Sequence, residues 1–406
     1  MKRLLAVLYV IATCAIKASA QSGCTDSTAN NYDPNAVIND GSCTYNVTHA
    51  TAKLISPLAS NINESSGLTY SYDVLWTHND SGNPPQIFKI DTTDASTLQT
   101  VDIDNYPNTD WEDIADDSAY IYIGNFGNND GDRKDLAILK ILKSDIGSGP
   151  LVHVTAQAIA FSYTDQKSFV SSKTNNFDCE SLISVGDSLY IFTKDRGDSK
   201  SREYCLPKTP GTYSISPIDT LNASGLVTGA DYNPKTKEIA LVGYLSGHTN
   251  SFLWFLSDYQ GHRFFTGNKR RIEIGNNNEW QTEGICYDHS GTRLFISCES
   301  AGNIPASLFV LDKSSYVITS VPTYKKSPVV SVFPNPTNSA INIQLETPGA
   351  VNVTLTSLNG QELLCENYTG TYFISLNTSG LAAGVYLLKV QTQDGSMAVR
   401  KVEIAR

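Results

Sequence analysis

Three glutamates recur at equivalent places of a repeated pattern, and they are the residues best suited to chemistry. The pattern is a polar residue, then a small or acidic residue, then an apolar residue. Its five copies begin at Ser66, Glu112, Glu180, Thr228 and Glu283. If the five segments are equivalent strands around one axis, these first residues face one another. Three carboxylates would then converge and raise one another's pKa unless a cation neutralises them.

Oxygen ligands from separate strands suit a hard cation such as calcium. We therefore predict that Glu112, Glu180 and Glu283 bind calcium, either as a structural ion or as a Lewis acid. The alternative is that these side chains only satisfy backbone donors at the strand starts and contact water.

Loops beside these strands extend the candidate site. His78 is the one histidine that the repeat places at the rim, and an imidazole transfers protons near neutral pH. It is the candidate catalytic base, with a solvated loop histidine as the alternative. Lys194 and Arg196 could clamp an anion or form a surface ion pair. The predicted ligand pocket consists of Ser66, Asn125, Lys194, Thr228, Asp231 and Glu299.

A second oxygen-rich segment spans residues 23–43. Cys24 and Cys43 bound a polar loop too small to bury a core, which predicts a disulfide between them. Asp26, Asp33 and Asp40 could cage a calcium ion with nearby carbonyls. Alternatively, the segment is a stapled spacer whose Asx residues only make turns. The segment resembles a short module seen beside exported bacterial domains.

The strands that would position the ring of glutamates are also repeated. After each opening comes a second signature of two apolar residues, a small residue and a variable one. These signatures begin at Leu75, Tyr122, Ile191, Leu241 and Phe295. A third apolar strand follows in every copy, and fourth strands are visible at residues 98–103, 156–163, 213–218 and 270–274. Four strands repeated radially predict a β-propeller at residues 51–325.

Five blades are directly legible, and an alternative sixth blade could occupy residues 143–176. The last blade could take its outer strand from residues 317–324, or from residues 52–58, which would close the ring. The predicted fold class is therefore all-β, with a five-bladed (alternatively six-bladed) β-propeller.

The N-terminus predicts export. A basic start, the apolar run 4–16 and small residues at 18–20 form a signal peptide over residues 1–20. That run is too short to span a bilayer, and no later segment is apolar enough, so we expect no transmembrane segment. The formal net charge of −11 argues against nucleic acid as a partner. Outside the signal peptide seven cysteines remain, so at least one thiol is free, and the pairing of Cys179, Cys205, Cys286 and Cys298 stays open.

Residues 326–406 predict a separate compact β-domain after a boundary at 325–328. Alternating strands at 341–345 and 351–355 accompany the motifs Phe333-Pro334-Asn335-Pro336, Asn359-Gly360, Gly384-Val385-Tyr386 and Arg400-Lys401. Residues 331–406 resemble the type A C-terminal sorting domain of the type IX secretion system of Bacteroidetes. The resemblance implies an immunoglobulin-like sandwich, contact with the secretion machinery, and a secreted or outer-membrane surface location.

Two functional hypotheses remain for the propeller, beside a purely structural surface role. The first is a binding domain for an extracellular ligand, a glycan or small phosphoester, at a calcium-assisted acidic channel mouth. The second is a calcium-dependent hydrolase of phosphoesters, esters or lactones, because the acidic ring is loosely similar to phytase-like esterase and lactonase propellers. Common serine hydrolase, zinc protease and nucleotide-binding motifs are absent from the sequence.

Overall fold

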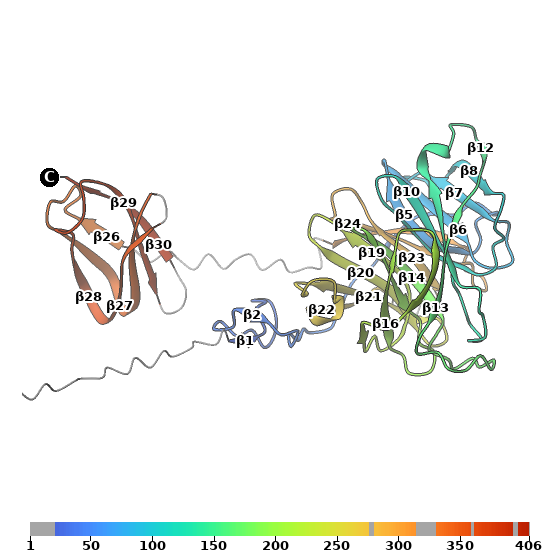
Figure 1. The fold of residues 1–406 in the computed structure, drawn as a ribbon, viewed down its shortest axis with the longest axis horizontal. Coiled ribbons are helices and arrows are strands. Elements are labelled where there is room, and N and C mark those ends of the chain that lie inside the picture. Colours follow the sequence, from blue (N-terminus) through green and yellow to red (C-terminus); the bar gives the residue numbers. More distant parts are fainter. Residues whose placement is uncertain (1–20, 276–279, 314–329, 359–360, 393–396, 406) are drawn as a thin grey trace, which may run out of the picture. The chain divides into compact units, whose positions relative to one another are not determined.

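The computed structural model describes residues 21–275, 280–313, 330–358, 361–392 and 397–405 (Figure 1). They fall into two compact units, residues 21–313 and residues 330–405. The expected signal peptide, the alternative closing strand at 317–324, the boundary at 325–328 and the Asn359-Gly360 turn lie outside the described residues. In the part of the chain that the structure describes, no helix has the length and apolar character needed to cross a membrane.

In the first unit, five sheets of mainly antiparallel strands radiate from a common axis, and each sheet is one blade. In blades 1 and 2 the first four strands run outward in sequence order. Blade 1 consists of β5 (Ser65–Ser71), β6 (Val74–Asn79), β7 (Gln86–Ile90), β8 (Thr97–Ile103) and β12 (Leu151–Val154). Blade 2 consists of β9 (Trp111–Asp116), β10 (Tyr120–Asn125), β11 (Ala137–Leu142), β13 (Gln157–Tyr163) and β17 (Gly211–Ile215), with η1 (Lys143–Asp145) after β11.

Blades 3 and 4 repeat this order, and blade 5 repeats it in its first three strands. Blade 3 consists of β14 (Cys179–Val185), β15 (Ser188–Thr193), β16 (Ser201–Pro207) and β18 (Asp219–Leu221). Blade 4 consists of β19 (Leu226–Asn233), β20 (Glu238–Leu245), β21 (Thr249–Ser257), β22 (Asn268–Glu273) and β3 (Thr48–His49), with η2 (Phe264–Thr266) before β22. Blade 5 consists of β23 (Thr282–Tyr287), β24 (Arg293–Cys298), β25 (Ser307–Asp312) and β4 (Lys53–Pro57).

The ring closes through β4. This strand precedes blade 1 in the sequence, yet it pairs antiparallel with β25 as the outer strand of blade 5. Of the two closing strands that the sequence left open, the structure therefore uses the one at residues 52–58. The inner strands β5, β9, β14, β19 and β23 contact one another in a closed cycle. Five blades are thus confirmed.

Two details differ from the sequence prediction. No sixth blade occupies residues 143–176, because β12 and β13 extend blades 1 and 2. Residues 213–218 were predicted as the fourth strand of blade 3, and this prediction is wrong. Instead β17 crosses to blade 2 and pairs in parallel with β13, while the short β18 completes blade 3. The crossing strand covers the edge of β13, which would otherwise offer unpaired backbone groups.

The hydrophobic core lies between the blades. Each of five buried clusters joins two neighbouring sheets, for example Ile87 of blade 1 with Ile121 of blade 2, and Phe88 of blade 1 with Phe295 of blade 5. The second strands are buried on both faces because a neighbouring blade packs on each side. This packing explains why their sequences are almost continuously apolar rather than alternating.

The second unit is a β-sandwich. Its strands are β26 (Val330–Phe333), β27 (Ala340–Ser357), β28 (Glu362–Asn377), β29 (Gly384–Thr392) and β30 (Met397–Ile404). The long strand β27 pairs with β26 in its first half and with β29 in its second half, and it pairs with β28 along both. Its core contains Ile341, Val353, Leu376, Leu388 and Val402. This unit therefore has a hydrophobic core of its own.

Candidate functional site

A bulge at the same level of all five inner strands explains the repeated opening pattern. In each blade the inner strand has one residue more than the second strand between two paired positions. Such bulges redirect side chains and are common beside functional sites. The extra residues are Ser66, Glu112, Glu180, Thr228 and Glu283. The predicted ring therefore exists as five equivalent backbone irregularities.

Glu112 is the centre of a buried acidic cluster at this end of the propeller. One carboxylate oxygen from each of Asp80, Asp110 and Glu112 lies within 4.8 Å of the others, and the same holds for Glu112, Asp178 and Glu180. Asp80 follows the second strand of blade 1, whereas Asp110 and Asp178 directly precede the inner strands of blades 2 and 3. Loop residues thus bring carboxylates to the ring glutamates, and we call these five acids the mouth cluster.

Two cations neutralise one side of the mouth cluster. Lys194 Nζ lies 2.9 Å from Glu180 Oε2, and both side chains are almost completely buried. Arg196 Nε lies 2.9 Å from Asp178 Oδ2, and its NH2 lies 3.8 Å from Glu180 Oε1. Burial opposes the charge of Lys194, but Glu180 holds its pKa well above the usual range. The sequence alternatives of anion clamp and surface pair are both inaccurate for Lys194, because its ion pair is internal.

The other side of the cluster has far less positive charge. Within the described residues, Asp110 forms one ion pair, with Arg133, whose NH1 lies 3.9 Å from Asp110 Oδ2. Burial and the charges of Asp80 and Asp178 raise the pKa of Asp110 to about 7. Burial and the charge of Glu180 likewise raise the pKa of Glu112 well above its usual range. Crowded carboxylates with raised pKa values bind either protons or a cation.

Glu283 also faces this end but stands apart from the two three-carboxylate groups. Its Oε1 accepts a hydrogen bond from the Tyr244 hydroxyl at 3.2 Å. Its Oε2 is buried and has no hydrogen-bond partner within the described ranges. Glu299, another predicted pocket residue, accepts a hydrogen bond from Gln281, and its pKa is raised well above the usual range by burial and by Glu283. A buried carboxylate in such crowded acidic surroundings can bind a proton or a cation.

Ser66 and Thr228 occupy ring positions without exposing their hydroxyls. Ser66 Oγ donates to the backbone oxygen of Glu112 at 2.9 Å, and Thr228 Oγ1 donates to the backbone oxygen of Thr282 at 2.6 Å. Each bond joins two adjacent blades, so these side chains stabilise the ring. Asn125, from the predicted pocket, accepts a hydrogen bond from the backbone N–H of Asp110 and so supports that loop.

His78 is not at the rim, and its assignment as a catalytic base is wrong. Its side chain is 0 % exposed, packs edge-on against Trp111, and its Nδ1 lies 3.0 Å from the backbone oxygen of Asn79. Burial lowers its pKa to about 4. The repeat placed His78 correctly on its strand, but the contact with Trp111 of blade 2 buries this position in the core.

The histidine near the mouth is His248, which the sequence reasoning missed. It lies in the loop between β20 and β21, exposed, with its ring 4.9 Å from Tyr244. Burial lowers its pKa, and the nearby charges of Lys194 and Arg196 act in the same direction. No repeat signature marks this loop, so only the contact with Tyr244 reveals its position.

Asp231 lies at the opposite end of the inner strands. Its Oδ2 accepts a hydrogen bond from the backbone N–H of Tyr287 at 2.7 Å, and burial raises its pKa to about 7. Asp231 follows Thr228 by three residues along the extended strand β19, and this length of strand carries it away from the mouth. Its assignment to the mouth pocket is therefore wrong.

Asp113, which the sequence reasoning passed over, is a buried carboxylate that joins the inner strands of several blades. Its carboxylate accepts backbone N–H groups from Ile114, Leu182 and Ala230 at 2.9, 2.8 and 3.2 Å, and these residues belong to blades 2, 3 and 4. Gly67 of blade 1 makes room, because a Cβ there would lie 2.9 Å from Asp113 Oδ1. One carboxylate thus ties three blades together.

The N-terminal module is stapled as predicted, but its aspartates do not gather. Cys24 and Cys43 form a disulfide, whereas Cys179, Cys205, Cys286, Cys298 and Cys365 are free. Asp26 binds Thr28 and Tyr45, Asp33 binds Asn35 and Gln21, and Asp40 binds Ser42. Within the described ranges, the three carboxylates form no common cluster. The predicted calcium cage is therefore not assembled, because each carboxylate caps its own turn.

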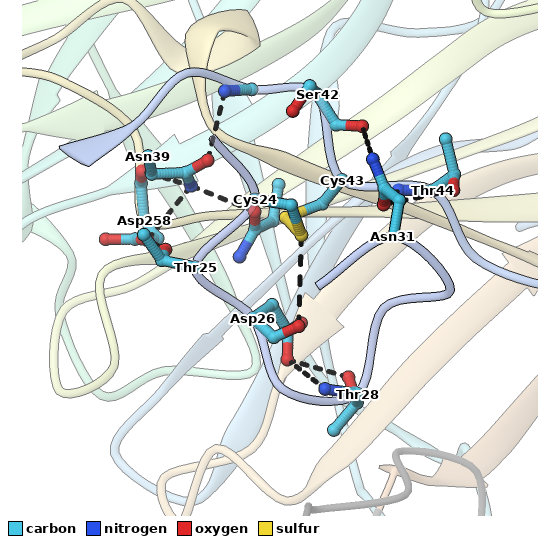
Figure 2. Close-up of a disulfide and its surroundings, with 12 residues drawn as sticks. Cys24, Thr25, Asp26, Thr28, Asn31, Asn39, Ser42, Cys43, Thr44 and Asp258 are labelled. Atoms are coloured by element: carbon cyan, nitrogen blue, oxygen red, sulfur yellow. Dashed lines mark hydrogen bonds between the residues drawn. A yellow bond between two sulfur atoms is a disulfide. The ribbon is translucent and has the colours of Figure 1, made fainter. Parts of the chain in front are cut away.

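The module instead docks on blade 4. Figure 2 shows Asn39 beside Asp258, which its side chain contacts at 2.9 Å while also reaching Asn268 at 2.9 Å. Thr25 donates a further hydrogen bond to Asp258 at 3.2 Å. The following strand β3 pairs in parallel with β22. The segment therefore covers the outer edge of blade 4 and is not a free spacer.

Comparison with known proteins identifies the second unit. Residues 331–405 match the family model described as a secretion system C-terminal sorting domain. This part of the chain is a sorting domain of the type IX secretion system. It directs export to the cell surface or the extracellular space and implies contact with the secretion machinery. The chain is therefore a secreted cargo with a β-propeller domain.

The chain also resembles several solved structures at low sequence identity. A PQQ-bound aldose sugar dehydrogenase from Streptomyces coelicolor is 11 % identical, with 65 % of this chain and 98 % of that chain covered and a TM-score of 0.40. A GH43_1 enzyme from Xanthomonas citri is 12 % identical, with 64 % and 89 % covered and a TM-score of 0.38. A GH43 β-xylosidase/α-arabinofuranosidase from a compost metagenome is 10 % identical, with 65 % and 94 % covered and a TM-score of 0.37. No curated protein matches the chain.

Proposed function

We propose that the propeller is an exported binding domain whose mouth cluster holds a calcium ion that helps to bind an extracellular ligand. The observation that carries this proposal is the convergence of buried and half-buried carboxylates on Glu112, which belongs to both three-carboxylate groups. All of these ligands are oxygens, which favours a hard cation. An exported protein meets calcium at concentrations that weak sites with dissociation constants of about 10⁻⁴–10⁻³ M can use.

The ion is expected between Asp80, Asp110 and Glu112. In the second group Asp178 and Glu180 already have Arg196 and Lys194 as counterions. Within the described residues, the first group forms one ion pair, between Asp110 and the more distant Arg133, although the charge of Lys194 also acts on Asp80. A calcium ion takes six to eight oxygens, so three carboxylates leave coordination positions for water or for ligand oxygens. A glycan hydroxyl or a phosphoester oxygen can fill them, and Arg196 lies beside the cluster to contact an anionic group.

Calcium titration of the mature chain tests this proposal. Calcium should bind and raise the melting temperature. Glu112→Gln should weaken calcium binding at least tenfold, or about 1.4 kcal/mol. The same substitution should stabilise the calcium-free protein, because it removes one like charge from the cluster. The matched control is Asp187→Asn on an exposed turn. No calcium binding by the wild type, or equal binding by Glu112→Gln and the wild type, would reject the proposal.

A hydrolase is the second candidate, and His248 is the observation that favours it. This exposed histidine lies near Lys194 and Arg196 and has a lowered pKa, so it is neutral and able to accept a proton near neutral pH. Turnover of a phosphoester, ester and lactone panel, with calcium and after chelation, tests this alternative. Calcium-dependent turnover that His248→Asn abolishes would support it. Complete inactivity with calcium bound would leave the binding function alone.

A further inference from the structure

The end of the propeller opposite the mouth cluster contains a recess. It has a volume of about 690 Å³ and is lined by the far ends of inner strands, including Thr69, Ser71, Asp116 and Asp231. Ligand pockets commonly measure about 300–1,000 Å³. None of the residues that line this recess belongs to the mouth cluster, so the two are distinct places on the propeller.

A smaller recess adjoins the first. It measures about 380 Å³, is floored by Trp76 and Ile121, and shares Ser71, Tyr72 and Lys143 with its larger neighbour. Tyr72 and Lys143 line both recesses, so the two adjoin each other, and we call them together the depression. A ligand with several linked units can contact both recesses at once.

Tyr72 is an unusual residue at the junction of these recesses. It forms the two-residue turn between β5 and β6 with Asp73, and their φ angles are 53° and 62°. Such turns favour Asn and Gly, and a bulky aromatic residue with positive φ costs stability. The Tyr72 side chain is 82 % exposed, with Lys143 Nζ 5.4 Å from the ring centre. The turn thus presents an aromatic face beside a cation, where strain commonly marks function.

The walls combine donors and acceptors with both signs of charge. Lys143 contacts Ser71 at 2.9 Å and pairs with Asp116, which also accepts a hydrogen bond from Thr69 at 2.8 Å. Lys208 pairs with Asp117 at 2.8 Å. An ammonium group has three donors, so each lysine can offer a hydrogen bond beyond its carboxylate partner. Paired charges do not select a strongly charged ligand, but they suit hydroxyl groups, which both donate and accept.

We propose that this depression binds a neutral oligosaccharide, with a sugar ring against Tyr72 and hydroxyl groups on Lys143, Lys208 and their carboxylate partners. Aromatic faces and flanking hydrogen-bonding groups are the combination that such a ligand requires, since a sugar has apolar C–H faces and polar edges. The proposal is independent of calcium at the mouth, because the two recesses and the mouth cluster share no residue.

The test is titration of the mature chain with neutral hexasaccharides of glucose, xylose and mannose. At least one should bind, and Tyr72→Asn should weaken that binding at least tenfold. Asparagine tolerates positive φ, so this variant keeps the turn while it removes the ring. Its melting temperature verifies folding. Tyr32→Asn, which removes another exposed tyrosine, is the matched control and should bind like the wild type.

Four results would overturn the proposal. The first is no binding of any of the three hexasaccharides at millimolar concentration. The second is binding that Tyr72→Asn leaves unchanged. The third is tighter binding of an acidic oligosaccharide, oligogalacturonate, than of every neutral one. Affinity that is equal with and without calcium supports the site at this end, whereas loss of sugar binding on calcium removal would place the ligand at the mouth and overturn it. Absence of calcium binding alone would reject only the function proposed for the mouth.

Discussion

Lys194 and Glu180 form an ion pair inside the propeller, with 2.9 Å between Nζ and Oε2 and with 4 % and 3 % of the two side chains exposed. Lys194 also lies 5.2 Å from the ring centre of Tyr244, which in turn donates to Glu283. One lysine therefore connects ring glutamates of blades 3 and 5. Its ammonium group neutralises part of the negative charge of the mouth cluster, whether or not a cation is bound there.

Replacement of Lys194 should have a large effect. We expect Lys194→Met to lower the free energy of unfolding by about 3 kcal/mol in calcium-free buffer, because a buried carboxylate loses its counterion. Glu180→Gln should cost less, since Glu283 still contributes negative charge near Lys194. Urea unfolding of both single variants and the double variant measures this. The double variant should lose less than the sum of the two losses, and simple additivity would show that the pair is not coupled.

Asp113 should be essential for joining the blades. Asp113→Ala leaves the N–H groups of Ile114, Leu182 and Ala230 without their acceptor. Each buried unsatisfied donor costs about 1–3 kcal/mol, so we expect a loss of at least 3 kcal/mol. Thermal unfolding measures it, with Asp187→Asn as the control. A loss below about 1 kcal/mol would contradict the role assigned to Asp113.

Stability should fall as the pH rises towards 9, and Glu203 should be one cause. Burial raises the pKa of Glu203 to about 8, although its Oε2 accepts the Phe264 N–H. Between the unfolded pKa of about 4.5 and this value, the folded chain binds a proton that the unfolded chain has lost. The stabilisation is complete below the unfolded pKa and is lost as the pH rises through about 8.

Glu203→Gln tests this pH dependence, because glutamine cannot titrate. Urea unfolding at pH 5, 7 and 9 should show a smaller loss of stability for the variant than for the wild type. Parallel pH profiles would exclude Glu203 as a contributor. Residual pH dependence in the variant is expected from Asp231, whose pKa burial raises to about 7.

The disulfide should hold the N-terminal module on blade 4. Cys24 and Cys43 are 19 residues apart, and a loop of that size contributes about 3 kcal/mol by restricting the unfolded chain. In the variant with both cysteines replaced by serine, residues 21–45 should become susceptible to proteolysis while the blades stay resistant. Asn39→Ala, which removes contacts to Asp258 and Asn268, should give a weaker effect in the same direction. Unchanged cleavage in both variants would show that the docking contacts are not needed.

The sequence by itself determined the repeat, the export domain and the Cys24–Cys43 pair, because these depend on local patterns. Apolar second strands and polar openings recur once per blade, so the sequence pattern alone indicates the blades. The same repeat placed Glu112 and Glu180 at equivalent positions, although the bulge that redirects them was not visible.

Only the tertiary structure decided which side chains meet. Asp80 and Asp110 lie outside the opening pattern, yet loops bring them to Glu112. His78 and His248 show the limit most clearly: the first is in phase with the repeat but buried by Trp111, and the second has no signature but lies near the mouth. Burial and proximity arise from contacts between blades, which residue spacing along one strand does not encode.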